Sequence, residues 1–371
     1  MTPRSVAVLG AGNGGCAAAA DLARRCDDVR LYNRSASTLQ PIIDRGGVEL
    51  TGALGDAFVP LDVVTTDLAR ACDGAELVML CVPTSAHDFF VDSLAEVLAP
   101  GQPVFLNPGH VGGGLYLANE IHRRTGRADI PFGETTTLTY GARMAGPAKV
   151  NVMFVPTGVA FAAFPGSAQS ELFALCHELY PELVEADNVL ETALLCINSV
   201  EHPAQVICNA GWVEATGGDF RFYHDGTSPA VGRVIDRLDE ERLAIAAALG
   251  MKTKSFVEYF HELGYTSRRA VETGSGYVAL QDSEPNRWIR GARSLDGRYV
   301  HEDIGRGLVP WAEIACVHGV KTPMMDALIA LASVMNGIDY RREGLTLEGL
   351  GLEGRPPETW DRYLCEGIAA Q

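Results

Sequence analysis

The chain has 371 residues, more than one hydrophobic core usually serves, so two domains are expected. With 47% hydrophobic and 21% charged residues it is not a disordered chain, and its net charge of −17 argues against nucleic acid and anionic membranes as general partners. No apolar run reaches the roughly 18–20 residues of a membrane span, no signal peptide precedes the first strand, and the nine scattered cysteines lack metal-binding spacing, so we expect a cytoplasmic protein without disulfides or metal.

The first half of the chain alternates strands with helices. Short apolar runs predict buried strands at 5–10, 29–35, 75–83, 103–109, 149–154 and 158–164. Residues 46–61 alternate and turn like a hairpin, and a helix is expected over 86–98. The alternation is typical of βαβ units, so it predicts an α/β domain with a mostly parallel sheet over residues 1–187.

A glycine-rich turn, "VLGAGNGGCAAAADLA", follows the first strand and opens a helix. Gly10 permits a tight turn, Gly12 lets the backbone approach a pyrophosphate, and Gly15 allows the helix to pack closely on the strand. The free N–H groups of the helix N-terminus favour an anion. This context predicts a Rossmann domain with a doubly wound sheet and a dinucleotide site, with the cofactor-binding candidates Gly10, Gly12, Asn13, Gly14 and Gly15.

The residues after the second strand bear on the choice of cofactor. An NAD-preferring site usually has an acid there, which binds the ribose 2′-hydroxyl. This chain has Asn33, Arg34 and Ser35 instead, and an arginine can pair with a 2′-phosphate. The pattern favours NADP(H) as the cofactor, with NAD(H) left open.

Polar and ring residues also follow two later strands, in "CVPTSAH" and "NPGHVGG". The carboxyl ends of strands in an open parallel sheet line the ligand crevice. Pro83 is therefore a cofactor-side candidate, and Asn107, Gly109 and His110 are candidates on the cofactor or substrate side, although ordinary loop chemistry would give the same residues.

From residue 188 the chain is nearly all helical, so residues 188–371 are expected to form an all-α domain. One long helix is expected over the stretch that starts at 188 and contains "NSVEHPAQVICNAG". Another is expected after Ser228, which can cap it, with Pro229 in its first turn. Two more are expected within 307–337.

His202 stands out in the first of these helices. Wound at about 100° per residue, the helix places His202 opposite the apolar stripe, and the uncharged partners on that face indicate a site rather than open solvent. Pro203 is expected to kink the helix near the imidazole. An imidazole that moves protons needs an orienting acceptor, and "RYVHEDIGRGLVP" offers Glu302 and Asp303. The polar face consists of Asn198, His202, Gln205 and Asn209.

Three segments, "GAGNGG", "NSVEHPAQVICNAG" and "RYVHEDIGRGLVPWAEIACVHGVKTP", resemble the octopine/nopaline (opine) dehydrogenase family in order along nearly the whole chain. The length is closest to bacterial members that make N-(carboxyalkyl) amino acids. The resemblance implies an oxidoreductase that joins the amine of an amino acid to an α-keto acid such as pyruvate and reduces the imine with NAD(P)H, and that also runs in reverse.

The resemblance also implies roles for individual residues. The catalytic histidine falls on His202, its acidic partner on Asp303, and an arginine that lies toward the cofactor on Arg298. One departure is His110, where some animal members carry a glutamine that contacts the keto acid. From the segment "GETTTLTYGAR" the resemblance implies Glu134, Thr135 and Arg143 as substrate candidates. His110, from its strand end, and Asn198, from the polar helix face, complete the substrate candidates.

Two other functions fit the same pattern. A two-domain 2-keto or 2-hydroxy acid reductase would need no amine, and an NADP(H)-sensing protein would need no chemistry. The expected partners are small molecules, an amino acid and an α-keto acid, without nucleic acid or membrane, and possible self-association as a homodimer.

Overall fold

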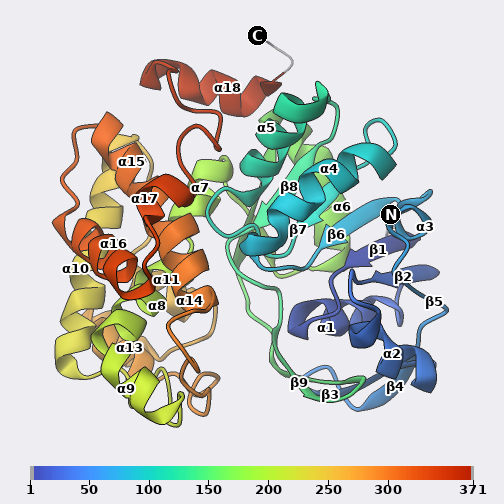
Figure 1. Cartoon of the computed structure of the whole chain (residues 1–371), viewed down its shortest axis with the longest axis horizontal. Helices are drawn as coiled ribbons and strands as arrows, with labels where there is room; N and C mark the ends of the chain where they lie inside the picture. Colours follow the sequence, from blue (N-terminus) through green and yellow to red (C-terminus); the bar gives the residue numbers. More distant parts are fainter. Residues whose placement is uncertain (1–3, 369–371) are drawn as a thin grey trace. The chain divides into compact units, whose positions relative to one another are not determined.

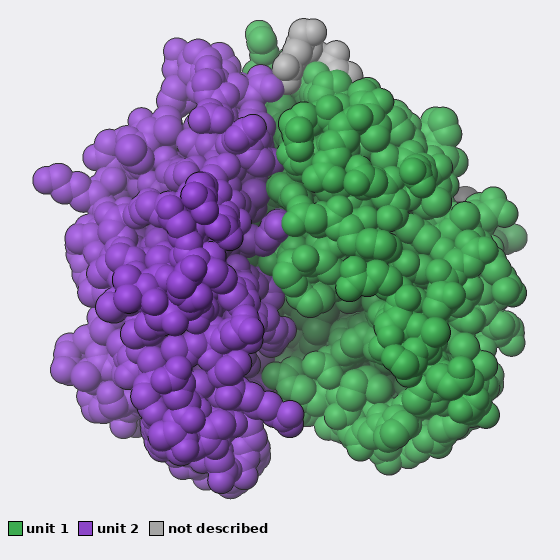
Figure 2. All heavy atoms as spheres, in the orientation of Figure 1, with its two compact units in different colours: residues 1–189, 361–371 green, residues 190–360 purple. Residues whose placement is uncertain are grey.

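A computed structural model describes residues 4–368, which form helices and strands throughout (Figure 1). The chain divides into two compact units, one containing residues up to 189 together with those from 361 on, and the other containing residues 190–360 (Figure 2). The sequence placed the boundary at 187/188 and gave the whole C-terminal end to the second domain. The difference arises at Tyr363 of α18 (Trp360–Glu366), whose ring lies 5.3 Å from that of Phe164 and whose hydroxyl donates to Asn119 at 2.7 Å.

The main sheet of the first unit has eight strands, and its neighbours are parallel except for one antiparallel pair, β8 with β11. Its central strands are completely buried because helices cover the parallel sheet. This arrangement confirms the predicted Rossmann domain. In spatial order the strands are β12 (Leu183–Glu185), β11 (Val159–Phe164), β8 (Phe132–Thr135), β7 (Val104–Leu106), β6 (Leu77–Leu80), β1 (Ser5–Leu9), β2 (Asp28–Tyr32) and β5 (Val63–Thr65).

A second, four-stranded sheet contains the predicted hairpin. β3 (Gly47–Gly52) pairs antiparallel with β4 (Ala57–Pro60), as expected. The expected strand at 149–154 is β10 (Lys149–Phe154), which pairs in parallel with β3 and antiparallel with β9 (Gly141–Gly146). Because β3 and β10 lie about a hundred residues apart in the chain, hydrophobic patterning could not reveal this pairing.

Helix α1 (Asn13–Leu22) packs against strands of both sheets, β1 and β2 of the first and β3, β9 and β10 of the second. Its residues from Gly15 to Leu22 are all buried. A helix buried on every side needs apolar residues all round, and the close approach of two sheets leaves room for little more than methyl groups. This geometry explains the run of four alanines at 17–20.

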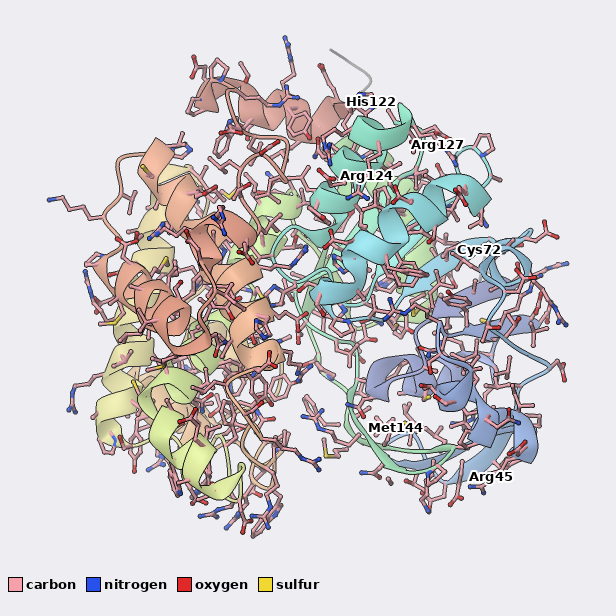
Figure 3. All side chains as sticks on the ribbon, viewed as in Figure 1. Arg45, Cys72, His122, Arg124, Arg127 and Met144 are labelled. Atoms are coloured by element: carbon pink, nitrogen blue, oxygen red, sulfur yellow. The ribbon has the colours of Figure 1, made fainter. Side chains whose placement is uncertain are left out.

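The remaining helices of this unit flank the sheets. Helix α5 ends with His122, Arg123 and Arg124, and cations in a last turn favour the helix dipole (Figure 3). The helices, with two short 3-10 turns, are α2 (Ala36–Arg45), α3 (Leu68–Cys72), η1 (Thr84–Ala86), α4 (His87–Val97), α5 (Gly113–Thr125), η2 (Gly166–Ala168) and α6 (Gln169–Leu179).

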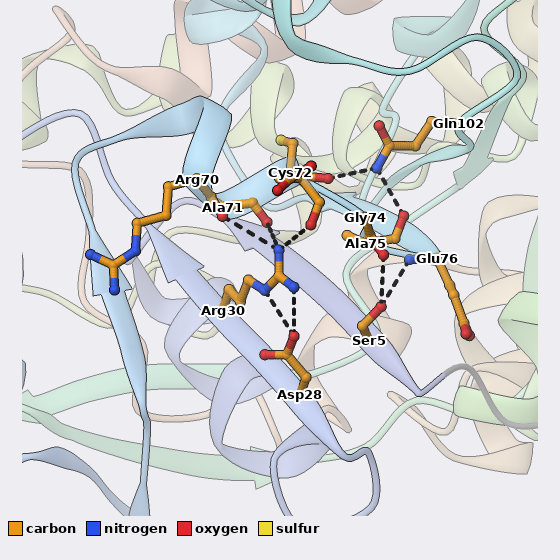
Figure 4. A network of polar contacts seen from close by, with 11 residues as sticks. Ser5, Asp28, Arg30, Arg70, Ala71, Cys72, Gly74, Ala75, Glu76 and Gln102 are labelled. Atoms are coloured by element: carbon orange, nitrogen blue, oxygen red, sulfur yellow. Dashed lines mark hydrogen bonds and ion pairs between the residues drawn. The ribbon is translucent and has the colours of Figure 1, made fainter.

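A polar network connects the turn between α3 and β6 to β2 and to Gln102 (Figure 4). The guanidinium of Arg30 on β2 donates to the carbonyls of Ala71 and Asp73 and pairs with Asp28 at 2.6 Å. Gln102 donates to the carbonyls at 72 and 75, both at 2.8 Å. These contacts satisfy backbone carbonyls that the turn leaves outside secondary structure.

The second unit is helical, and within residues 190–360 its single β pairing is a bridge between Arg221 and Arg290. This confirms the predicted all-α domain. The expected cap is present, since the Ser228 hydroxyl accepts from the Val231 amide at the start of α10. The helices are α7 (Val189–Leu194), α8 (Asn198–Cys208), α9 (Ala210–Thr216), α10 (Pro229–Ala248), α11 (Phe256–Glu262), α12 (Arg268–Thr273), α13 (Gly276–Gln281), α14 (Arg298–Val300), η3 (His301–Leu308), α15 (Val309–Val317), α16 (Pro323–Asn336), α17 (Tyr340–Glu343) and η4 (Pro357–Thr359).

The single long helix expected from 188 onward is wrong, because the segment forms α7, α8 and α9 with breaks at 195–197 and at Asn209. Side chains take the last carbonyls of α7: Arg242 donates to Leu194 at 2.7 Å and the Trp311 indole donates to Ala193 at 3.2 Å. A helix end needs such partners. Helix α8 instead runs through Pro203 without interruption.

Among the described residues, no helix has both the length and the apolar character needed to cross a bilayer. All nine cysteines are free thiols. Burial raises the pKa of three of these thiols to about 12, so they are poor nucleophiles; they are Cys16, Cys72 and Cys81.

Candidate active site

The glycine-rich turn has the shape that a dinucleotide site requires. A Cβ on Gly15 would lie 1.6 Å from the Gly10 carbonyl oxygen, and one on Gly10, whose φ is +114°, would lie 2.4 Å from the Cys81 carbonyl oxygen. These two glycines are fixed by packing. A Cβ on Gly12 would meet nothing within 4 Å, so its exposed backbone at the start of α1 is open to a ligand. The residues therefore fit the pyrophosphate of NAD(P).

Asn13 and Asn33 hold the turn in place. The Asn33 side-chain oxygen accepts from the Ala11 amide at 3.2 Å. The Asn13 side-chain oxygen accepts from the amide of Met144 on β9 at 2.8 Å, which ties the turn to the second sheet. Met144 is labelled in Figure 3. Gly14 faces the side chain of Leu138, at 2.7 Å from an added Cβ. Direct cofactor contacts by Asn13, Gly14 and Asn33 remain predictions.

Arg34 and Ser35 are exposed at the end of β2, where the sequence placed them beside the cofactor ribose. The Arg34 guanidinium lies over the Phe89 ring, 5.1 Å from its centroid, which leaves its edge N–H groups free to donate. The Ser35 and Ser37 hydroxyls are hydrogen-bonded to each other at 2.8 Å at the N-terminus of α2. The described chain thus offers a cation, two hydroxyls and a helix N-terminus here, and these groups suit a 2′-phosphate.

Most of the other candidates at strand ends form hydrogen bonds within the first unit. Glu134 is fully buried, and its carboxylate accepts from the Gly114 amide of α5 at 2.7 Å. The Thr135 hydroxyl donates to the Leu106 carbonyl at 3.4 Å, and Asn107 donates to the Thr139 hydroxyl at 2.8 Å. Their roles toward a substrate remain predictions. Pro83 is exposed and His110 is buried with a φ of +62°, a backbone conformation that non-glycine residues adopt rarely.

In the second unit, His202 on α8 and Asp303 on η3 lie in contact although 101 residues separate them. His202 Nδ1 is 2.8 Å from Asp303 Oδ2, and both residues are about 2% exposed. His202 Nε2 is 2.8 Å from the Tyr223 hydroxyl. With Asp303 accepting from Nδ1–H, the lone pair on Nε2 accepts from the tyrosine. The imidazole therefore has a fixed tautomer and can exchange a proton at Nε2.

Asp303 is positioned by an unusual helix, since η3 is a π-helix. Its widened turn depends on glycine, because a Cβ on Gly305 would lie 2.9 Å from the Tyr340 ring. The Gly305 carbonyl accepts from the Leu345 amide at 2.8 Å. π-helical turns occur frequently at functional sites.

Aromatic rings surround the imidazole. The Tyr299 ring centroid lies 4.3 Å from that of His202, and Phe222 stacks on Tyr299 with centroids 4.6 Å apart. The Arg298 guanidinium lies over the Tyr299 ring, 5.2 Å from the ring centroid. Desolvation lowers the pKa of Arg298, but Tyr299 and the nearby acids outweigh it and raise the pKa above the usual range. Arg298 is therefore a permanent cation beside the dyad.

The polar face of α8 is enclosed by protein, since α8 is buried from Ser199 to Ile207. The segment 222–227 covers this face with one contact per turn. Tyr223 reaches His202, the Gln205 amide donates to the Thr227 hydroxyl at 2.7 Å, and the Asn209 amide donates to the Gly226 carbonyl at 2.7 Å. Asn198, at the start of α8, is half-buried and remains a substrate candidate.

Sequence reasoning missed three residues at this site. Tyr223 and Tyr299 carried no recognisable signal, since tyrosines occur in many packed regions. Glu201 was visible beside His202 in "SVEHP", yet received no role. Its burial, at 2% exposed, is what distinguishes it from a solvent-facing glutamate.

Comparison with known proteins gives a consistent result. Residues 185–336 match the family model described as NAD/NADP octopine/nopaline dehydrogenase, alpha-helical domain, and residues 5–107 match that of the NAD-dependent glycerol-3-phosphate dehydrogenase N-terminus. The chain is 34% identical to an opine dehydrogenase of Arthrobacter sp. (strain 1C), covering 95% of this chain and 96% of that protein. It is 30% identical to the protein ocs of Agrobacterium tumefaciens (strain Ach5), covering 94% and 96%.

Solved structures share the fold. Octopine dehydrogenase with NADH and L-arginine superposes with a TM-score of 0.76 at 21% identity, covering 98% of both chains. Yersinopine dehydrogenase with NADP+ bound gives a TM-score of 0.70 at 17% identity, covering 100% of this chain and 99% of that one. The two-part architecture read from the sequence is thus shared along the whole chain.

Proposed function

The chain belongs to the octopine/nopaline (opine) dehydrogenase family, as its motifs indicated, and we propose that His202 is its acid–base residue and Asp303 the partner that orients it. The protein is an NAD(P)-dependent oxidoreductase that acts on CH–NH bonds. It condenses an amino acid with an α-keto acid and reduces the product, and it catalyses the reverse oxidation. The contact of 2.8 Å between His202 and Asp303 is the observation that carries the assignment of residues.

The imidazole suits the proton transfers of this reaction. An amino acid enters as an ammonium and must lose a proton before its nitrogen attacks a ketone, and Nε2 is the atom of His202 that can accept this proton. The imidazolium so formed is stabilised by Asp303 and can return the proton to the departing hydroxyl of the carbinolamine. The rings of Phe222, Tyr223 and Tyr299 lower the local polarity, which strengthens these interactions and disfavours hydrolysis of the imine.

The nicotinamide cofactor supplies the hydride when bound. We assign its pyrophosphate to Gly10, Gly12 and the N-terminus of α1. The exposed guanidinium of Arg34 and the hydroxyl of Ser35 support NADP(H) as the favoured form, and NAD(H) remains possible. Pro83 and Arg298 complete the proposed cofactor set.

We also propose substrate-binding residues, a cellular location and an oligomeric state. His110, Glu134, Thr135 and Asn198 are proposed to select or hold the substrates. Nine free thiols support a reducing compartment, so we place the enzyme in the cytoplasm. A homodimer is proposed because α16 exposes apolar side chains, among them Val334 at 84%. Light scattering of the purified chain tests the homodimer.

A substrate panel tests the function. NADPH or NADH is mixed with pyruvate and single amino acids, and the decrease in reduced-nicotinamide absorbance is followed. We expect oxidation that requires both the keto acid and one class of amino acid. Oxidation with the keto acid alone would instead indicate a keto-acid reductase, and tight binding of NADPH without any oxidation would indicate a sensor.

A further inference from the structure

Glu201 is a second buried acid at the His202 site. It precedes His202 on α8, is 2% exposed, and places its Oε1 3.7 Å from His202 Nε2. Within the part of the chain that the structure describes, its Oε2 has no hydrogen-bond partner. A buried carboxyl oxygen without a partner costs stability, so it is not retained for packing.

The surroundings keep this carboxyl neutral. Burial raises the pKa of Glu201 well above its usual range, and Asp303 and Cys196 raise it further. The helices that pack on α8 include α10, α14, α16 and η3. The buried charges of α10 are committed elsewhere: Asp239 pairs with Arg242 at 2.6 Å, and Glu241 accepts from backbone amides of α16. The other titratable and charged groups near the dyad are Tyr223, Arg298, Tyr299 and Glu302.

The reaction requires more protons than one imidazole holds. The substrate ammonium releases one proton, which leaves with the hydroxyl as water. The reduced product is a secondary amine, which is protonated near neutral pH and so takes up a second proton. Condensation therefore consumes one proton overall. A single imidazole that has just protonated the leaving hydroxyl has none left for the product nitrogen.

We propose that Glu201 is a second catalytic acid, which donates its carboxyl proton to the product amine. This inference rests on the proposed function. The Glu201 O–H bond breaks, an N–H bond forms on the secondary amine, and the carboxylate regains a proton from water after product release. Because Nε2 and Oε1 are 3.7 Å apart, one nitrogen atom that takes the place of the Tyr223 hydroxyl at Nε2 can lie within hydrogen-bond distance of both. In the oxidation direction the carboxylate accepts the same proton.

The Glu201→Gln variant tests this role because it preserves shape and neutrality but carries no transferable proton. We expect kcat to fall about 10²-fold. In the condensation direction the alkaline limb of log kcat should change from a limiting slope of about 2 to about 1, since one required proton is lost. A matched control is Glu313→Gln on α15, which removes another acid whose pKa burial raises but whose carboxylate accepts from the Leu347 amide; its profile should match the wild type.

A measurement without turnover separates this inference from the proposed function. Infrared difference spectra of wild type minus Glu201→Gln at neutral pH should show the C=O stretch of one protonated carboxylic acid. Lack of that band, or a uniform fall in kcat with an unchanged alkaline slope, would overturn the role of Glu201. Lack of wild-type turnover with every amino acid and keto acid would instead overturn the proposed function.

Discussion

The glycine-rich turn and the His202 site were built in opposite ways. The turn is continuous: Gly10, Gly12 and Gly15 lie within six residues, and their spacing alone sets the geometry. The His202 site is assembled from residues on α8, on the loop at 222–223 and on η3, up to about a hundred residues apart. A continuous motif can be read from sequence, whereas an assembled one needs the fold or a relative.

The two sites also differ in what holds them. At the turn, backbone meets backbone at distances that leave no room for a side chain. At His202, side chains meet side chains in a buried hydrogen-bonded chain. A larger side chain at the turn therefore creates a steric clash, whereas a substitution at His202 removes a group needed for proton transfer. The following substitutions separate these two kinds of failure.

The largest effect is expected for His202→Ala. Loss of the acid–base group should lower kcat by about 10³–10⁴-fold with little change in NADPH affinity, as measured by steady-state kinetics and fluorescence titration. His122→Ala, which removes an exposed histidine on α5, is the control and should retain activity. A His202→Ala variant that kept kcat within a few-fold of the wild type would remove the imidazole from the mechanism.

Asp303→Asn should have the next largest effect, about 10²-fold in kcat, because the amide cannot stabilise the imidazolium. Glu302→Gln is the matched control, since the sequence alone offered both acids. We expect the control to stay near wild-type activity. The reverse order of the two variants would mean that Glu302 orients the histidine.

Gly15→Ala and Gly12→Ala should separate packing from ligand binding in the turn. The added methyl of Gly15→Ala meets the Gly10 carbonyl, so we expect destabilisation of about 3 kcal/mol or more. Gly12→Ala should leave the free energy of unfolding within about 0.5 kcal/mol but weaken NADPH binding about tenfold, as measured by denaturation and titration. Equal destabilisation by both would show that Gly12 is also fixed by packing.

Arg34→Ala should raise the KM for NADPH about tenfold, because a hydrogen bond to a charged group is worth about 1.5–3 kcal/mol, and should leave the KM for NADH nearly unchanged. Phe89→Leu, which removes the ring beneath the guanidinium, is the control for loss of packing alone. Better wild-type activity with NADH than with NADPH would contradict this use of Arg34.

A further effect concerns stability and pH. The pKa of Glu201 is raised in the folded state, so the folded state holds this proton more tightly than the unfolded state. The free energy of unfolding is therefore highest below the unfolded-state pKa and falls as the pH rises toward the folded-state pKa. Within that pH range, each pH unit lowers the free energy of unfolding by about 1.4 kcal/mol. Thermal melts from pH 5 to 8 should therefore show Glu201→Gln gaining stability relative to the wild type. A constant difference would mean that Glu201 is already ionised.

The fold was largely predictable because its signals are local. Strand runs such as 5–10 and 75–83 and the cap at Ser228 were read correctly. The continuous helix from 188 was not, because its break depends on Arg242 and Trp311, which reach α7 from distant helices. The pairing of β3 with β10 could not be predicted either, because the two strands lie far apart in the sequence.

The site was predictable only in part. The approach of His202 to Asp303 came from a family resemblance, since spacing could not select between Glu302 and Asp303. The segment at 222–227 that covers the polar face of α8 could not be predicted, because it has no periodic signature. Glu201 shows the limit most clearly: its sequence position was plain, but its isolation from solvent appears only after folding.

Because Asp303 lies on the π-helical turn of η3, its contact with His202 depends on the number of residues in that turn as well as on their identity. Removing one residue from a helix rotates the residues beyond it about the helix axis, so removing the residue between His301 and Asp303 would turn the carboxylate away from the imidazole while both members of the dyad were still encoded. Chains that diverge here by insertion or deletion would retain the two lobes and lose the proton chemistry.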